Sequence, residues 1–163
     1  LKMIEYKTAV LVGAAMKMGA IVAETSEENK NLIYDFGLNL GIAFQLQDDY
    51  LDAFGNPETF GKQVGGDIIE NKKTYLYLKA LEFGNSEEKE QLLHLFSIQP
   101  NDNTDKISSV KDIFNQTGAS QATQKAIQDY TFFAFETLEK MNISNDKKMI
   151  LKAFGGKLMN RNV

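Results

Sequence analysis

Proline is almost absent from this chain, and its scarcity limits the folds that the chain can adopt. Only two of the 163 residues are proline, Pro57 and Pro100, and both lie among turn-forming neighbours. In the long proline-free stretches, apolar residues recur at the spacing of a helix that buries one face. We find no sustained alternation of apolar and polar residues, the pattern that predicts strands. The sequence therefore predicts an all-α fold.

Capping residues and glycines mark the ends of the predicted helices. The expected helices run approximately from Met3 to Ala23, from a capping box at Thr25 and Glu28 to Phe54, from Asp67 to Phe83, from a capping pair at Asn85 and Glu88 to Phe96, from Asp105 to Gln116, from Ser120 to Met141, and from Asn145 to Phe154. Because no linker-like stretch interrupts the series, we expect a single all-helical domain, a helical bundle, over residues 1–163.

Two glycines lie one turn apart inside the long second helix. Gly37 and Gly41 each cost the helix about 1 kcal/mol relative to alanine. A glycine in such a place allows another backbone or a ligand to come close. We therefore expect a close approach at these two positions.

The amino-acid composition excludes several classes of catalytic and metal site. The chain has no cysteine and a single histidine, His94, so disulfides, thiolate metal sites and histidine-dependent triads are excluded or left without partners. Its net charge of −4 argues against a nucleic-acid partner. No apolar run approaches the roughly 18 residues that a transmembrane helix needs, and no secretory signal is evident. We expect a cytoplasmic protein, and one that is part of a longer chain because the sequence opens at Leu1 inside a predicted helix.

The chemistry is concentrated near the end of the second helix. Asp48 and Asp52 are spaced i, i+4, and Asp49 and Asp52 are spaced i, i+3, so the three carboxylates share one edge of the helix. They repel one another and lie at the helix end that disfavours anions. A divalent cation removes both penalties. Oxygen ligands without histidine or cysteine suit Mg²⁺, with Mn²⁺ as the alternative ion. A solvated acidic helix end is the competing interpretation.

Two other segments offer phosphate ligands. Lys62 lies in the glycine-rich stretch from Gly61 to Gly66, where backbone can approach a bulky anion and an ammonium can neutralise it. Lys7 and Thr8, on the first helix, place an ammonium beside a hydroxyl. Taken alone, the first is typical of an ordinary loop and the second of an exposed helix face.

Together these segments resemble the trans-isoprenyl diphosphate synthases, the farnesyl and geranylgeranyl diphosphate synthases of the polyprenyl synthetase family. The second aspartate-rich motif of that family, Phe-Gln-x-x-Asp-Asp-x-x-Asp, is matched by Phe44, Gln45, Asp48, Asp49 and Asp52. The family's Lys-Thr pair is matched by Lys7-Thr8, and its later lysine by Lys62. The resemblance is strongest over residues 6–76 and implies the all-α isoprenoid synthase fold, here incomplete.

The resemblance also implies a reaction and a role for each matched residue. An allylic diphosphate ionises, the double bond of isopentenyl diphosphate attacks the cation, and a proton is lost. Mg²⁺ ions and basic residues stabilise the departing diphosphate. By position, Asp48 is the direct metal ligand, and Asp49 and Asp52 act through metal-bound water. Lys7 and Lys62 hold the allylic diphosphate. Thr8 assists Lys7 and Gln45 orients it, and Phe44 faces the apolar tail of the substrate or the developing cation. Homodimerisation is expected as well.

The chain departs from the family pattern in one respect. A complete synthase carries an earlier Asp-Asp-x-x-Asp motif, whereas this chain has only one such motif. We therefore expect these residues alone to be inactive, and product chain length is not encoded here. A non-catalytic regulatory or binding subunit of the same fold, and a purely structural bundle with a chance acidic cluster, are the alternatives. A terpene cyclase is disfavoured, because its second metal motif usually combines Asn, Ser or Thr with Glu.

Overall fold

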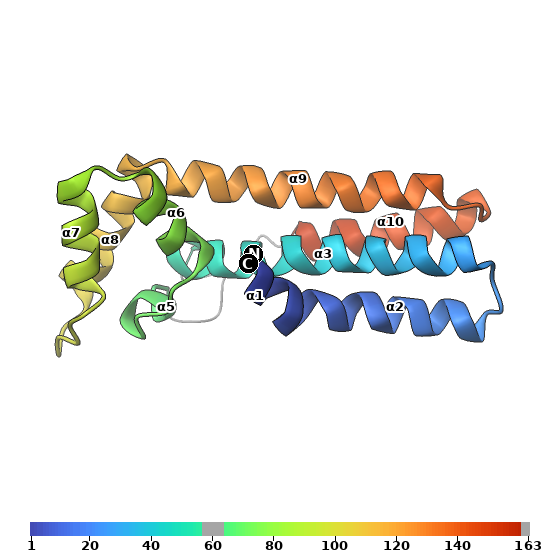
Figure 1. Cartoon of the computed structure of the whole chain (residues 1–163), viewed down its shortest axis with the longest axis horizontal. Coiled ribbons are helices and arrows are strands. Elements are labelled where there is room, and N and C mark those ends of the chain that lie inside the picture. The colour runs from blue at the N-terminus through green and yellow to red at the C-terminus, as the bar shows by residue number, and fades with distance from the viewer. Residues whose placement is uncertain (57–63, 161–163) are drawn as a thin grey trace. The chain divides into compact units, whose positions relative to one another are not determined.

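The computed structural model describes residues 1–56 and 64–160, and every regular element in these ranges is helical, which confirms the predicted class. The elements in chain order are α1 (Lys2–Ile4), the π-helical η1 (Glu5–Ala9), α2 (Val10–Val22), α3 (Glu27–Phe54), α5 (Gly66–Ile69), α6 (Tyr75–Phe83), α7 (Ser86–Leu95), α8 (Thr104–Gln116), α9 (Ala119–Lys140) and α10 (Asn145–Met159) (Figure 1). Within these ranges no helix is both long and apolar enough to cross a bilayer.

The described residues fall into two compact units. The first unit contains residues 1–47 and 126–160, and the second contains residues 48–56 and 64–125. In the first unit α2, the larger part of α3, the later part of α9 and α10 lie lengthwise beside one another (Figure 1). Its core is built from apolar residues of α3 and α9 together with the turn after α9: Ile33, Phe36, Leu40, Ala134, Leu138 and Met141.

Small residues line the contact of α3 with η1 and α2. A Cβ atom added to Gly37 would lie 3.0 Å from the Cα of Gly13, and one added to Gly41 would lie 2.8 Å from the Cα of Ala9. Residue 37 lies against residue 13 and residue 41 against residue 9, so the residue number rises on one side as it falls on the other. The two helical segments therefore run antiparallel. The expectation that Gly37 and Gly41 admit a neighbouring backbone is therefore confirmed, and that neighbour is the first helical segment of the chain.

The start of α3 is held by side chains rather than by the predicted capping box. The Asn29 N–H donates to Ser26 Oγ at 3.2 Å, so the cap lies one residue later than Thr25. The buried Asn29 side chain also accepts from the Asn142 N–H at 3.0 Å and donates to the Asn142 carbonyl at 3.1 Å. These bonds join the start of α3 to the turn that follows α9.

The second unit has its own core. It is formed by the end of α3, helices α5 to α8 and the start of α9, and its buried members are Ala53, Ile68, Leu76, Tyr77, Ala80, Leu92, Val110, Ile113, Phe114 and Ala119. The predicted capping box of α7 is confirmed. The Glu88 N–H donates to Asn85 Oδ1 at 3.0 Å, and the Asn85 N–H donates to Glu88 Oε2 at 2.8 Å.

Two predicted helix boundaries are wrong. The helix expected over residues 67–83 is divided into α5 and α6, because Asn71 adopts a left-handed conformation with φ of 55° between them. Asparagine tolerates this conformation better than most residues do. The last helix does not stop at Gly155-Gly156 but continues to Met159. Gly155 is buried, and a Cβ there would lie 3.1 Å from the ring of Phe135, so this glycine serves helix packing instead of helix termination.

We expect Gly41→Ala to destabilise the protein by about 1–2 kcal/mol. The added methyl would press on the backbone of Ala9, and overpacking of this kind typically exceeds the helix-propensity gain of about 1 kcal/mol. Gly19→Ala is the matched control on α2, because no atom lies within 4 Å of its added Cβ, and it should stabilise by about 0.5–1 kcal/mol. Urea unfolding of both variants measures the difference, and equal stabilisation by the two substitutions would contradict the close contact.

Candidate functional site

Opposite faces of α3 carry its aromatic and acidic residues near the helix end. At about 100° per residue, Asp48, Asp49 and Asp52 fall on one side and Tyr50 and Phe54 on the other. The two aromatic rings lie 5.1 Å apart and pack against the core of the second unit. Gln124 Nε2 donates to the Tyr50 hydroxyl at 2.5 Å, and burial raises the pKa of this phenol. The aromatic side thus anchors the end of α3 to that core.

Asp52 has a structural partner that the sequence did not reveal. Its Oδ2 accepts the Asp67 N–H at 2.8 Å, and its backbone carbonyl accepts the Gly65 N–H at 2.5 Å. Gly65 has φ of 88°, which favours glycine, and a Cβ on Gly66 would lie 3.2 Å from Asp52 Oδ1. The start of α5 is therefore fitted directly onto the Asp52 carboxylate.

Acidic groups gather around Asp52. Burial raises the pKa of this carboxyl, and the charges of Asp67 and Asp48 raise it further, against the Asp67 N–H hydrogen bond and the charge of Lys72. Lys72 Nζ lies 2.8 Å from Asp67 Oδ1 and 2.8 Å from Glu70 Oε2, and these two bonds raise the pKa of the lysine. Asp67 and Lys72 thus belong to the cluster around Asp52, and sequence reasoning did not place them there because nothing local relates residue 67 to residue 52.

The arrangement suits a hydrated divalent cation rather than a closed metal cage. In residues 1–56 and 64–160 no three acidic or histidine side chains converge on a point that could hold a metal ion. Asp48 makes no hydrogen bond or ion pair with any residue of these ranges, whereas one oxygen of Asp52 is occupied by the Asp67 N–H. Mg²⁺ commonly takes one or two carboxylates and completes its shell with water and substrate phosphates. The donor set here fits that mode of binding.

The Lys-Thr pair lies on the π-helical segment η1 of the first unit. Single π-helical turns inside α-helices are frequent at functional sites. The Thr8 hydroxyl donates to Gln45 Oε1 at 3.0 Å, so two residues that are 37 positions apart in the sequence meet. Lys7 is exposed, and Phe44, the residue before Gln45, is half-buried on α3. Lys62, the remaining predicted ligand, lies outside the described residues.

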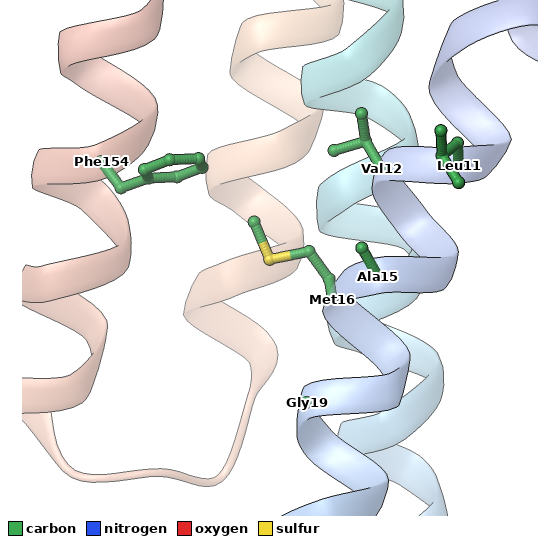
Figure 2. Close-up of a pocket in the computed structure, with 6 residues that line it drawn as sticks. All are labelled: Leu11, Val12, Ala15, Met16, Gly19 and Phe154. Atoms are coloured by element: carbon green, nitrogen blue, oxygen red, sulfur yellow. The ribbon is translucent and has the colours of Figure 1, made fainter.

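An apolar groove begins at Leu11 on α2, one turn after Lys7 and Thr8. It is lined by Leu11, Val12, Ala15, Met16, Gly19 and Phe154. Figure 2 shows Phe154 on α10 pointing across this groove toward Met16 on α2. Its lining carries no charged side chain, so it offers a surface suited to a hydrocarbon.

The sequence profile described as polyprenyl synthetase matches residues 1–117. This chain belongs to the polyprenyl synthetase family. It is 35% identical over 150 residues to a short chain isoprenyl diphosphate synthase of Methanothermobacter thermautotrophicus, a match that covers 92% of this chain and 45% of the relative. The chain therefore spans about half the length of the curated relatives that it matches.

Solved structures give the same result for this polyprenyl synthetase chain. The crystal structure of a geranylgeranyl pyrophosphate synthase is 49% identical with a TM-score of 0.89, over 98% of this chain and 50% of that one. A geranylgeranyl pyrophosphate synthase from Corynebacterium glutamicum, complexed with isoprenyl diphosphate and magnesium, is 27% identical with a TM-score of 0.85, over 96% of this chain and 44% of that one. The fold is that of the all-α isoprenoid synthases.

We expect Asp52→Asn to be more stable than the wild type at pH 7 without divalent cations, by about a few tenths of a kcal/mol, because the amide keeps the acceptor for Asp67 and removes a solvent-screened like charge. The raised pKa means that the folded state holds the Asp52 proton more tightly than the unfolded state does. The stabilisation from that proton is present at acid pH and is lost as pH rises through the folded pKa. The advantage of the asparagine variant should therefore shrink as pH falls through the same range.

Urea unfolding in EDTA at a series of pH values measures this difference. Asp52→Ala is the control, because it also removes the charge but leaves the Asp67 N–H without its acceptor, at a cost of about 1–3 kcal/mol. A loss of stability in Asp52→Asn at pH 7 would show that the carboxylate charge is stabilising in the folded protein.

Proposed function

We propose that this chain forms part of the active site of a magnesium-dependent prenyl diphosphate synthase, which joins an allylic diphosphate to isopentenyl diphosphate head to tail. The observation that carries the proposal is the acidic cluster of Asp48, Asp52 and Asp67 at the end of α3 and the start of α5. The names of the relatives support the substrate class, and the complex of the Corynebacterium glutamicum synthase with magnesium supports the ion.

The acidic residues have unequal parts in this proposal. Asp48, which has no partner in the described ranges, is the direct ligand of Mg²⁺ or Mn²⁺. Asp52 acts through metal-bound water, since one of its oxygens already accepts the Asp67 N–H. Asp49 has the same indirect role. When bound, the cation neutralises the negative charge that develops on the departing diphosphate.

Basic and hydroxyl groups hold the substrate's diphosphate. Lys7 supplies an exposed ammonium, and Lys62 supplies a second one. Gln45 Oε1 accepts the hydrogen bond of the Thr8 hydroxyl at 3.0 Å, which fixes the rotamer of Thr8. The lone pairs of the Thr8 oxygen then point away from Gln45. Phe44 faces the hydrocarbon part of the substrate. The groove that starts one turn after Lys7 and Thr8 is apolar, as an isoprenoid chain requires.

These 163 residues contain one Asp-Asp-x-x-Asp motif, and we propose that by themselves they do not turn over substrate. One motif supplies ligands for only part of the cation set that the reaction uses. The same observation favours a second candidate, a non-catalytic subunit of this fold that keeps the metal site. In either case we propose that the protein functions in a homodimer, as the family resemblance implies.

The proposal predicts that Mg²⁺ and pyrophosphate together raise the unfolding temperature of the chain. A ligand at about 100 times its dissociation constant stabilises the folded state by roughly 2.7 kcal/mol. Asp48→Asn should abolish most of this shift. Asp112→Asn is the matched control, because it removes one exposed carboxylate from α8 in the same unit and should leave the shift unchanged. Differential scanning fluorimetry with each ligand alone and with both provides the measurement.

Equal shifts in both aspartate variants would show that the ions bind elsewhere and would overturn the assignment of Asp48. The same samples, supplied with geranyl diphosphate and isopentenyl diphosphate, should give no longer product by mass spectrometry. Turnover by the isolated chain would refute the proposed need for a second aspartate-rich motif.

A further inference from the structure

Lys106, in the first turn of α8, is almost wholly buried. Its residue surface is only 3% exposed. Its ammonium donates to Asn71 Oδ1 at 2.6 Å and to the Ile98 carbonyl at 2.9 Å. Asn71 Nδ2 in turn lies 3.4 Å from the same carbonyl. The lysine therefore joins the turn between α5 and α6 to the loop before α8.

This lysine occupies an unfavourable place for a cation. No carboxylate of the described residues forms an ion pair with it, and burial lowers its pKa. The positive end of the helix dipole lies at the first turn of α8, which disfavours an ammonium there. Lysine is rarely buried without a charged partner. An apolar side chain of similar length could not make the two hydrogen bonds that this ammonium makes.

The bonds that begin at Lys106 lead to the acidic cluster. Lys106 holds the side chain of Asn71, which has φ of 55° and ends the turn after α5. The next residue, Lys72, donates its N–H to the Asp67 carbonyl at 2.9 Å and its ammonium to Asp67 Oδ1 at 2.8 Å. The Asp67 N–H then donates to Asp52 Oδ2 at 2.8 Å. All of these residues belong to the second unit.

We infer that Lys106 is a positioning residue for the acidic cluster: through Asn71 it fixes the turn that sets Lys72 and Asp67 against Asp52. It does not touch a substrate or a cation itself. The inference deepens the proposed function, because the carboxylates that it places are those assigned to the cation. Its structural part, the placing of Asp67, can be tested whether or not a cation binds.

The experiment compares Lys106→Met with Asn71→Gly and with Ile113→Val. Met keeps the buried stem but has no donor, and Gly accepts the positive φ of residue 71 but has no side chain for the lysine. Ile113→Val removes a methylene from the core of the second unit and leaves Asn71 and Ile98 unchanged, so it is the control for a general loss of stability. Native-state hydrogen exchange followed by NMR reports the Asp67 N–H, and calorimetry reports the binding of Mg²⁺ with pyrophosphate.

Lys106→Met and Asn71→Gly should each speed exchange of the Asp67 N–H at least tenfold relative to the amide of Leu92, and should weaken Mg²⁺–pyrophosphate binding several-fold. The double variant should resemble either single variant, because both break the same link. Ile113→Val should leave the relative exchange rate and the affinity unchanged. If Lys106→Met fails to fold, Asn71→Gly still tests the link.

Unchanged Asp67 exchange in Lys106→Met and Asn71→Gly would overturn the inference, and so would equal effects of Ile113→Val. Absence of Mg²⁺–pyrophosphate binding in the wild type is a different result. It would count against the proposed function, while the exchange of the Asp67 N–H would still confirm or refute the positioning role of Lys106.

Discussion

Repulsion among carboxylates is the constraint around which the second unit is built. The charges of Asp67 and Asp48 both act on the Asp52 carboxylate, and burial of Asp52 makes its negative charge still more costly. The neighbouring residues keep these carboxylates close together instead of separating them. The hydrogen bond from the Asp67 N–H and the glycine at position 66 hold Asp67 against Asp52, and Lys72 forms an ion pair with Asp67. A bound cation would offset this repulsion, and the proposed function rests on that expectation.

The first unit meets a different requirement, the close approach of two helices. Gly37 and Gly41 on α3 face Gly13 and Ala9 at distances that exclude larger side chains. This contact brings the π-helical segment that carries Lys7 and Thr8 close enough for Thr8 to reach Gln45. The glycines therefore weaken α3 as an isolated helix but set the position of the Lys7-Thr8 segment beside Gln45.

Sequence reasoning succeeded where the signal was local or came from a motif. Apolar spacing gave the helices, Asn85 and Glu88 gave a correct capping box, and the glycines of α3 predicted the close contact that the structure shows. Sequence reasoning failed where the conformation or role of a residue depends on a partner far away in the sequence. The apolar pattern runs through Asn71, whose turn is held by a lysine 35 positions away. Gly155 resembles a helix stop in the sequence but is required for packing against Phe135. Asp67 was not assigned to the site because its bond to Asp52 spans 15 residues.

Mn²⁺ can replace Mg²⁺ as a paramagnetic probe to test whether a cation binds at the end of α3, since both ions take oxygen ligands. A ¹⁵N-labelled sample of the chain would receive pyrophosphate and a small fraction of an equivalent of Mn²⁺. We expect the amide signals of residues 48–52 and of Asp67 to broaden first, while those of Glu87, Glu88 and Glu90, an acidic run on α7, remain sharp. Equal broadening of both acidic segments would contradict a specific cation site at the end of α3.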